Sequence, residues 1–233
     1  MSKRVEADNN RISLVQLSAH QERTRPAGEF SAWLQQTRQA IELNGAADVP
    51  CGACNACCRS SYFIRIRADE ADAINNIPAP LLFPSPGEPD VFVLGFDENG
   101  HCPMLVDQQC SIYEHRPQTC RTYDCRVFAA SGIAPEKDRP DVGKAVAAWA
   151  FSYAAKNSTD PKTSAEHSKN MHRALLTAAQ FLQEQQASIP QLTDNPLHLA
   201  LTALECQPLF TQEPLPDKIE MLKQVKHHLN VNA

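Results

Sequence analysis

Four cysteines within eight residues constrain this chain more than any other feature of its sequence. They stand at Cys51, Cys54, Cys57 and Cys58. Thiolates at C-x2-C spacing reach one metal ion from both ends of a tight turn, whereas a disulfide between such close neighbours closes a small loop and gains little unfolded-state entropy. The stretch is therefore predicted to bind a soft metal ion or an iron–sulfur cluster.

A second set of four cysteines follows at wider spacing. Its members are Cys102, Cys110, Cys120 and Cys125. Four thiolates suit zinc or iron far better than magnesium or calcium, which prefer oxygen ligands. Eight thiols can hold two such centres, or one centre with spare thiols, and the spacing leaves both arrangements open.

Two adjacent cysteines limit how the thiols divide. Neighbouring side chains tend to point apart, so Cys57 and Cys58 either serve different centres or one of them is not a ligand. The C-x2-C-x2-C run that begins at Cys51 also matches the first three ligands of the bacterial ferredoxin loop. In that loop the fourth cysteine precedes a proline, as Cys102 precedes Pro103 here. The match modestly favours an iron–sulfur cluster.

The charge of the cysteine segment also points to a metal. Between Cys51 and Arg126 there are ten acidic residues, six arginines and no lysine. Deprotonated thiolates would add to this negative charge unless a metal ion neutralised them. The same acidity argues against a nucleic-acid-binding zinc finger, whose phosphate-binding face is basic.

Other side chains near the cysteines have two interpretations each. His101 and His115 are alternative metal ligands, although eight thiols leave no shortage of donors. Four arginines beside the cysteines either donate hydrogen bonds to sulfur or are ordinary surface residues. They are Arg59, Arg116, Arg121 and Arg126. Three aromatic residues either shield a centre from water or belong to the general core; they are Tyr113, Tyr123 and Phe128.

Composition and charge indicate the cellular location to expect. The chain has 233 residues, 42% of them hydrophobic, and a formal net charge of -5, which gives no electrostatic reason to expect nucleic acid or an anionic membrane. No apolar run reaches the roughly 18 residues of a membrane span, and the polar start of the chain does not resemble a signal peptide. We therefore expect a cytoplasmic location, where clustered cysteines bind metals more often than they form disulfides.

Local patterns predict an α+β fold, a small cysteine-rich metal-binding domain with short strands followed by a helical C-terminal part. Residues 1–28 are expected to be a loosely ordered arm, 29–132 the cysteine domain and 140–233 the helical region. A helix from Glu29 is predicted to bury Phe30, Trp33, Leu34 and Ile41 on one face.

Several further elements are expected along the chain. Strands are predicted at 60–67 and 91–96, with a short one at 104–106. The prolines of 78–89 exclude regular helix or a central strand, so this stretch is expected to be a stiff, extended loop. Helical spacing recurs at Val142, Val146, Trp149 and Tyr153. Two more helices are predicted at 164–186 and 217–229, and Cys206 is expected to be a buried apolar residue in a further helix.

The cysteine pattern resembles a known family. The C-x2-C-x2-C-C run, Cys102-Pro103, Cys110-Ser-Ile-Tyr and the Arg-Pro-x2-Cys-Arg sequence ending at Arg121 are similar to the YkgJ-type cysteine-cluster family, a zinc- or iron-chelating domain. The resemblance covers about residues 48–128. It implies seven ligand candidates: Cys51, Cys54, Cys57, Cys58, Cys102, Cys110 and Cys120. Cys125 joins them on spacing alone.

Two other functions remain open at this stage. A related cysteine pattern occurs in flagellin lysine N-methylases, where it is associated with an iron–sulfur cluster, which implies a protein-modifying enzyme acting on a protein substrate or partner. No glycine-rich methyl-donor loop is evident here. A thiol redox sensor using Cys57 or Cys58 is the third hypothesis, and it requires an exposed thiol of low pKa.

Overall fold

The computed structural model describes residues 25–43, 45–47, 49–153 and 160–231. Its helices are α1 (Phe30–Glu42), α2 (Ala71–Asn76), α3 (Gln118–Thr122), α4 (Arg126–Ser131), α5 (Pro140–Ala147), α6 (Pro161–Gln185), α7 (Pro196–Cys206) and α8 (Lys218–Val231). Its strands are β1 (Arg25–Glu29), β2 (Ile64–Arg67), β3 (Leu82–Ser85), β4 (Glu88–Leu94), β5 (Leu105–Val106), β6 (Gln109–Cys110) and β7 (Trp149–Ser152). Helices with short strands in small sheets confirm the predicted α+β class.

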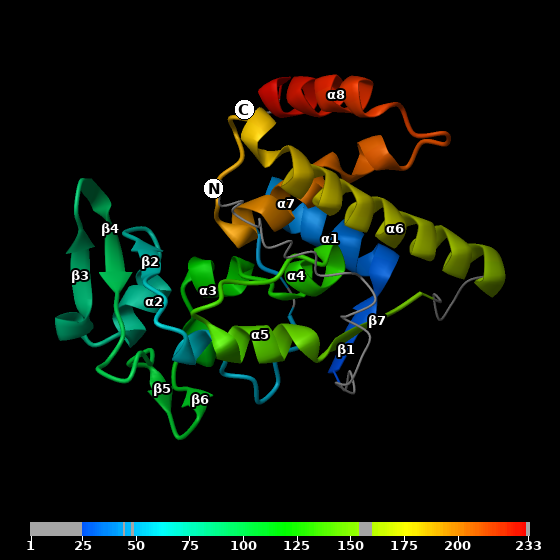
Figure 1. The fold of residues 1–233 in the computed structure, drawn as a ribbon. Coiled ribbons are helices and arrows are strands. Elements are labelled where there is room, and N and C mark those ends of the chain that lie inside the picture. The colour runs from blue at the N-terminus through cyan, green and yellow to red at the C-terminus, as the bar shows by residue number, and fades with distance from the viewer. Residues whose placement is uncertain (1–24, 44, 48, 154–159, 232–233) are drawn as a thin grey trace, which may run out of the picture.

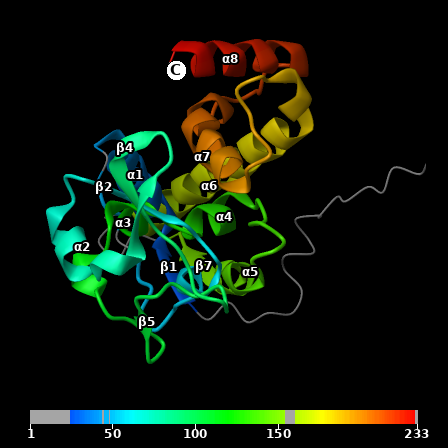
Figure 2. The same cartoon turned by 90° about the vertical axis from the view of Figure 1, so that its left-hand side faces the viewer.

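Two hydrophobic cores organise the molecule. The larger core draws on α1, α4, α5, α6, α7 and α8 together with β7, while the smaller one lies among β2, β4, α2 and the segments that carry Met104 and Ile112. Figure 1 shows the sheet β2–β4–β3 and α2 standing at one side of the helical part. In the perpendicular view α8 again lies at the end of the molecule beyond α6 and α7 (Figure 2). The larger core is continuous across residues 132–140, so the helical region packs directly against the cysteine segment.

Helix α1 begins where the sequence predicts. The Glu29 carboxylate caps its first turn by accepting hydrogen bonds from the backbone N–H groups of Ser31 (3.2 Å) and Ala32 (2.8 Å), which would otherwise lack partners. Phe30, Trp33 and Leu34 are buried as expected. Ile41 is instead 53% exposed, because the helix extends beyond the core before it ends at Glu42.

Strands β1 and β7 form a parallel pair that local sequence patterns do not predict. Arg25 lies opposite Trp149, and Glu29 lies opposite Ser152. The helical spacing that includes Trp149 is therefore misleading: α5 ends at Ala147 and the chain then becomes extended, because it pairs with a strand from the other end of the sequence. Residues 25–28 of the expected loose arm lie in β1, and the rest of that arm is outside the described residues.

The proline-rich stretch forms more regular structure than expected. A 3-10 turn at Ala79–Leu81 is followed by β3, which contains Pro84 and lies at the edge of the antiparallel sheet β2–β4–β3. An edge strand tolerates proline because one side of it needs no ladder hydrogen bond. Pro89 lies in the central strand β4, but before Val91, where its pairing with β2 begins. The expectation of a loop without strands was therefore wrong.

A tight hairpin joins β5 to β6. Asp107 and Gln108 both have positive φ, 49° and 65°, as the turn of a two-residue hairpin requires. The side chain of Asn55 donates hydrogen bonds to the backbone carbonyl of Gln108 (3.1 Å) and to its side-chain oxygen (2.9 Å). The hairpin is thereby attached to the first cysteine stretch.

The C-terminal helices follow the predicted pattern. Helix α6 buries Leu175 and Leu182, and Asn195 caps α7 by accepting a hydrogen bond from the N–H of His198 at 3.0 Å. Cys206 is buried at the end of α7, as expected for a small apolar residue. None of the helices in the described ranges combines the length and the apolar character that crossing a bilayer requires.

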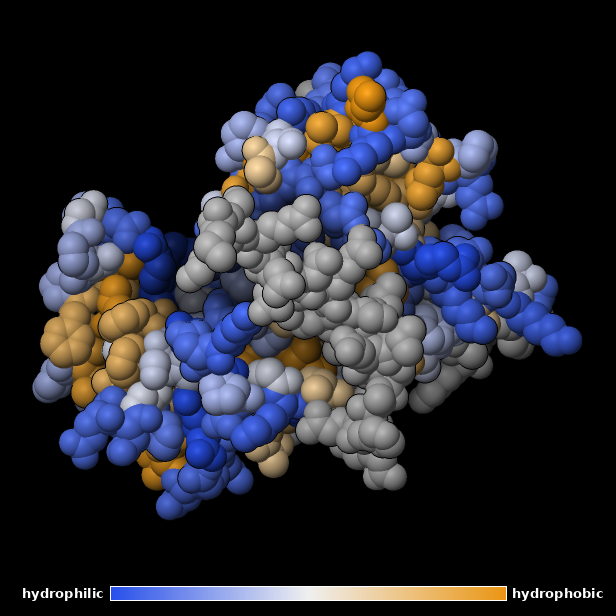
Figure 3. All heavy atoms as spheres, in the orientation of Figure 1, coloured by the Kyte–Doolittle hydropathy of each residue, from blue (hydrophilic) through white to orange (hydrophobic). Residues whose placement is uncertain are grey.

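Exposed aromatic side chains occur in and next to the sheet β2–β4–β3. Phe63 and Phe83 are 66% and 59% exposed. The ring of Phe63 contacts the ring of Phe96, with the two centroids 4.9 Å apart. Figure 3 shows hydrophobic residues gathered at the side of the molecule that carries β3 and β4. Elsewhere on this face hydrophilic residues predominate among those that are coloured.

Candidate metal centre

The first cysteine stretch is a series of tight turns. The N–H of Cys54 donates to the carbonyl of Cys51 at 2.9 Å, and Gly52 between them has a φ of +53°, which glycine adopts without steric cost. Cys57 and Cys58 then open a 3-10 turn that ends at Arg59. The local sequence thus folds four thiols into a compact segment.

The strongest interactions among the eight thiols fall within two sets of four, although Cys58 also interacts with Cys51 and Cys54. The first set, called here the first group, is Cys51, Cys54, Cys57 and Cys125. Cys57 interacts electrostatically first with Cys125, and Cys125 interacts with Cys51 and Cys54. Cys125 belongs to the larger hydrophobic core and Cys54 packs against it. The cysteine inferred from spacing alone is therefore central to this group.

The second group is Cys58, Cys102, Cys110 and Cys120. The N–H of Cys102 donates to the carbonyl of Cys58 at 2.7 Å, which brings the two parts of the sequence together. Cys102 and Cys110 pack against the smaller core; Cys102 precedes the β5–β6 hairpin and Cys110 is the last residue of β6. Cys120, on α3, is exposed but interacts with the other three thiols.

Burial and crowding disfavour ionised thiols in both groups. Burial, followed by repulsion from Cys125, raises the pKa of Cys57 well above its ordinary value. Burial, followed by repulsion from Cys102, raises the pKa of Cys58 to about 12. For Cys125 burial again dominates and the pKa rises to about 11. A bound cation would offset both desolvation and repulsion, since metal coordination favours the thiolate.

The donor chemistry of each group fits zinc or iron, which thiolates bind well. The side chains are not arranged as an assembled site, however. Within the described ranges, no three His, Cys, Asp or Glu side chains converge closely enough to hold a metal ion. The fold thus brings the predicted ligands into two neighbourhoods without closing either of them.

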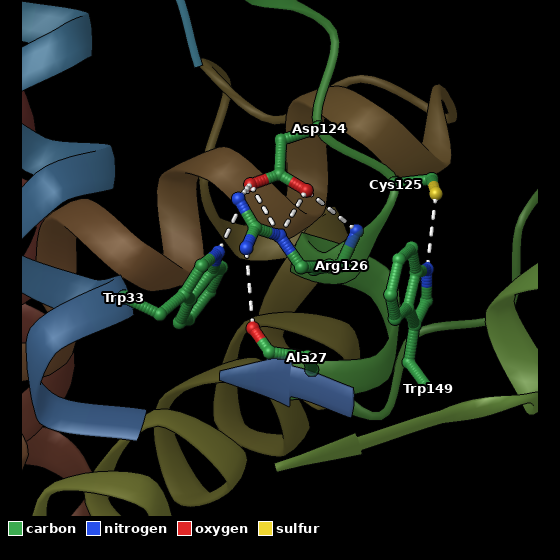
Figure 4. Close-up of polar contacts among 6 residues, drawn as sticks. All are labelled: Ala27, Trp33, Asp124, Cys125, Arg126 and Trp149. Atoms are coloured by element: carbon green, nitrogen blue, oxygen red, sulfur yellow. Dashed lines mark hydrogen bonds and ion pairs between the residues drawn. The ribbon is translucent and has the colours of Figure 1, made fainter. Parts of the chain in front are cut away.

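A buried ion pair fixes the chain on both sides of Cys125. Asp124 and Arg126 are paired at 2.8 Å with side chains only 5% and 7% exposed. Trp33 donates its indole N–H to Asp124 at 2.9 Å, and Arg126 donates to the carbonyl of Ala27 at 3.1 Å. Figure 4 shows this network on one side of the backbone while the Cys125 side chain points the other way, toward Trp149.

Most of the arginines proposed as sulfur donors have other partners. Arg59 pairs with Asp141 at 3.6 Å, Arg121 donates to the carbonyl of Arg116 at 2.8 Å, and Arg126 pairs with Asp124. Arg116 is the exception, because its guanidinium stacks on Tyr113.

Arg116 lies between the two groups. Its guanidinium stacks over the ring of Tyr113 at 3.7 Å and interacts with the thiols of Cys51 and Cys120. Its Nε is buried and has no hydrogen-bond partner among the described residues. Arg116 is therefore the one member of the four proposed arginines whose charge faces thiols of both groups in the described structure.

The two histidines considered as ligands lie elsewhere. The ring of His115 contacts the carboxylate of Asp72 at 3.0 Å, and the backbone N–H of His101 donates to Asp97 at 2.8 Å. Neither interacts with the cysteine groups in the contacts of the described residues.

The aromatic surroundings differ in part from the prediction. Tyr123 is close to Cys57 and Cys125, and its hydroxyl lies 3.4 Å from that of Tyr62. Phe128 is buried in the larger core, whereas Tyr113 is 42% exposed and stacks with Arg116 instead of covering a thiol.

A shallow groove of about 580 Å³ opens beside the first cysteine stretch. It is lined by residues of that stretch and by basic residues of other elements. They include Arg25, Cys51, Cys54, Arg59, Asp141 and Lys144. Three cationic side chains and one carboxylate therefore face the solvent-accessible side of the first group.

Comparison with known families agrees with the cysteine geometry. Residues 50–136 match the family model CxxCxxCC, described as a putative zinc- or iron-chelating domain. This segment carries the CxxCxxCC domain. The CxxCxxCC segment contains all eight cysteines of the two groups but spans well under half of the chain. Neither the curated proteins nor the solved structures provide a match to the chain.

Two residues outside the CxxCxxCC segment were missed by sequence reasoning. Trp149 donates its indole N–H to Cys125 Sγ at 3.2 Å, and Arg25 donates to the carbonyl of Cys51. No local pattern identifies them, because their positions depend on the pairing of β1 with β7.

Proposed function

We propose that this protein binds two zinc or iron centres, one in each four-cysteine group. The observation that carries the proposal is that thiols lie beside two separate hydrophobic cores, Cys54 and Cys125 at the larger one and Cys102 and Cys110 at the smaller one. The match of residues 50–136 to a zinc- or iron-chelating domain supports the same conclusion. In this proposal the first centre is held by Cys51, Cys54, Cys57 and Cys125, and the second by Cys58, Cys102, Cys110 and Cys120.

The proposal accounts for the adjacent pair of cysteines. Cys57 interacts most strongly with Cys125 and Cys58 with Cys102, although both also interact with Cys51 and Cys54. In this proposal each of the two contributes to its own centre. Binding would draw the sulfurs of each group together and replace thiol protons with a cation, so metal uptake should release protons. Arg116, between the groups, would supply further positive charge to both sets of thiolates.

The test is metal content together with an ultraviolet–visible spectrum, on protein purified without oxygen. Two zinc ions and a colourless protein would assign two mononuclear centres. Iron with matching sulfide and a broad charge-transfer band (~400 nm, for clusters of the kind in question) would assign iron–sulfur clusters to the same thiols. Protein that contains neither metal and takes up neither would overturn the proposal.

The groove favours one second candidate, a metal-dependent protein-modifying enzyme. A catalytic metal needs a side open to substrate, whereas a structural site is closed by its ligands. The groove reaches Cys51 and Cys54 and so gives the first group such a side. An activity that depends on metal in the first group, and is lost when Lys144 is replaced while metal content is kept, would establish this candidate.

The thiol-sensor hypothesis has less support. A redox-sensing cysteine requires a low pKa, but burial raises the pKa of both Cys57 and Cys58. Selective modification of one of them by mild peroxide in the metal-loaded protein would restore that hypothesis.

A further inference from the structure

Strands β1 and β7 border the first group although both lie outside residues 50–136. Their pairing places Arg25 directly opposite Trp149, and the N–H of Arg25 donates to the carbonyl of Ala148 at 3.0 Å. Each of these two opposed residues contacts a different end of the first group. The sheet therefore joins parts of the group that are far apart in sequence.

Trp149 makes the contact at the Cys125 end. Its indole N–H lies 3.2 Å from Cys125 Sγ, and the residue is only 2% exposed (Figure 4). An N–H donor to a ligand sulfur fixes the orientation of that sulfur and modifies the electron density it offers the metal. The indole N–H has no acceptor capacity, so its role toward sulfur is donation alone.

Arg25 makes the contact at the Cys51 end. Its guanidinium donates to the carbonyls of Cys51 and, at 3.4 Å, of Pro50. The same group lies over the ring of Trp149, 4.3 Å from its centroid. A continuous set of contacts thus runs from the backbone of Cys51 through Arg25 and Trp149 to the sulfur of Cys125.

We propose that Arg25 and Trp149 are positioning residues for the first centre, holding Cys51 and Cys125 in register for a shared metal. The inference rests on the proposed metal-binding function and goes beyond it, because it assigns roles to residues outside the CxxCxxCC segment. Among the described residues, the second group has no contact with Arg25 or Trp149. A substitution at either residue should therefore change the metal affinity of the first centre and not that of the second.

The test uses Co²⁺ as the probe, because cobalt bound by thiolates has charge-transfer absorption that reports its ligands. Trp149→Phe removes the N–H donor and keeps an aromatic face for Arg25. The control is Phe210→Leu, because Phe210 is also buried in the larger core, and its ring contacts Phe181 (centroids 5.5 Å apart) and no member of either cysteine group in the described contacts.

The expected result is specific to one centre. The full chain should bind two Co²⁺ ions, and Trp149→Phe should weaken one of them about 10-fold or more, as loss of such a donor typically does. The charge-transfer band of that ion should shift. Phe210→Leu should leave both affinities and the spectrum unchanged.

Arg25 is tested in parallel. Arg25→Ala should lower the affinity for the same single Co²⁺ ion as Trp149→Phe does. Arg25→Lys should lower that affinity less than Arg25→Ala, because lysine keeps the positive charge of the side chain. Substitutions that weaken both ions equally, or Trp149→Phe and Phe210→Leu variants that behave alike, would overturn the positioning role. Failure of the unsubstituted chain to bind Co²⁺, zinc or iron would instead refute the proposed function, and this inference with it.

Discussion

Cys57 and Cys58 are adjacent in the chain, yet each interacts most strongly with a thiol of a different group. Cys57 interacts most strongly with Cys125, and Cys58 with Cys102. Both lie in the 3-10 turn that starts at Cys57. One peptide bond thus connects the two proposed centres.

Single substitutions at this pair should therefore remove different ions. Cys57→Ser is expected to lose one of two bound metal ions and Cys58→Ser the other, while the double variant loses both. Metal analysis after gel filtration measures the stoichiometry. Cys206→Ala is the matched control, since Cys206 is remote from both groups and should leave both ions bound. Loss of both ions from either single variant would contradict separate centres.

The buried ion pair beside Cys125 should contribute strongly to stability. Arg126→Met leaves the Asp124 carboxylate buried without its main partner, and Asp124→Asn leaves the guanidinium uncompensated. We expect each to lower the free energy of unfolding by about 3–5 kcal/mol. The double variant should lose less than the sum of the two. Urea unfolding of all three variants forms the double-mutant cycle, and additive losses would show that the pair is not coupled.

Cys206 predicts a pH dependence. Burial, followed by repulsion from Glu205, raises the pKa of its thiol from 9.0 to about 12. Between these values the unfolded chain loses the thiol proton and the folded chain keeps it, so the stability contribution is complete below pH 9.0 and declines as pH rises toward about 12.

The measurement is the urea midpoint at increasing pH for the metal-free chain and for Cys206→Ala. The decline should be less steep in the variant, by up to about 1.4 kcal/mol per pH unit. Identical slopes would mean that the thiol ionises equally in both states.

Gly100 should be intolerant of a side chain. Its φ is +77°, and a Cβ there would collide with Ser61 Oγ. The left-handed conformation alone predicts that Gly100→Ala costs about 1–2 kcal/mol, and the collision adds to this. Ser61 itself has a φ of +53°, so Ser61→Gly should be neutral or stabilising and should rescue part of the loss in the double variant. Thermal unfolding measures all three, and a Gly100→Ala variant as stable as the parent would contradict the geometry.

Sequence patterns predicted the features that depend on near neighbours. The start of α1 and the strands β2 and β4 follow from a few residues each. The α+β class and the zinc- or iron-chelating character of the segment also follow from local spacing.

Features that depend on distant partners were not predictable in this way. Trp149 continues a helical spacing, but pairing with Arg25 makes it the start of β7. The prolines of 78–89 indicated an extended loop, whereas Pro84 lies in β3 and is accommodated there because β3 has a free edge. Assignment of Cys125 to the group of Cys57 required the fold, since nothing in the spacing indicates which of the later cysteines meets which of the earlier ones.

The parallel pairing of β1 with β7 can form only late in synthesis, because the two strands lie on opposite sides of the cysteine segment in the sequence. A ribosome makes β1 before any of the eight clustered cysteines and β7 after all of them. A parallel pair with so long a connection also forms slowly, because distant segments must meet before their contacts compensate for the ordering of the chain. The nascent chain therefore presents its thiols, already gathered by local turns, before Trp149 has been made, and the surroundings of Cys125 are completed last.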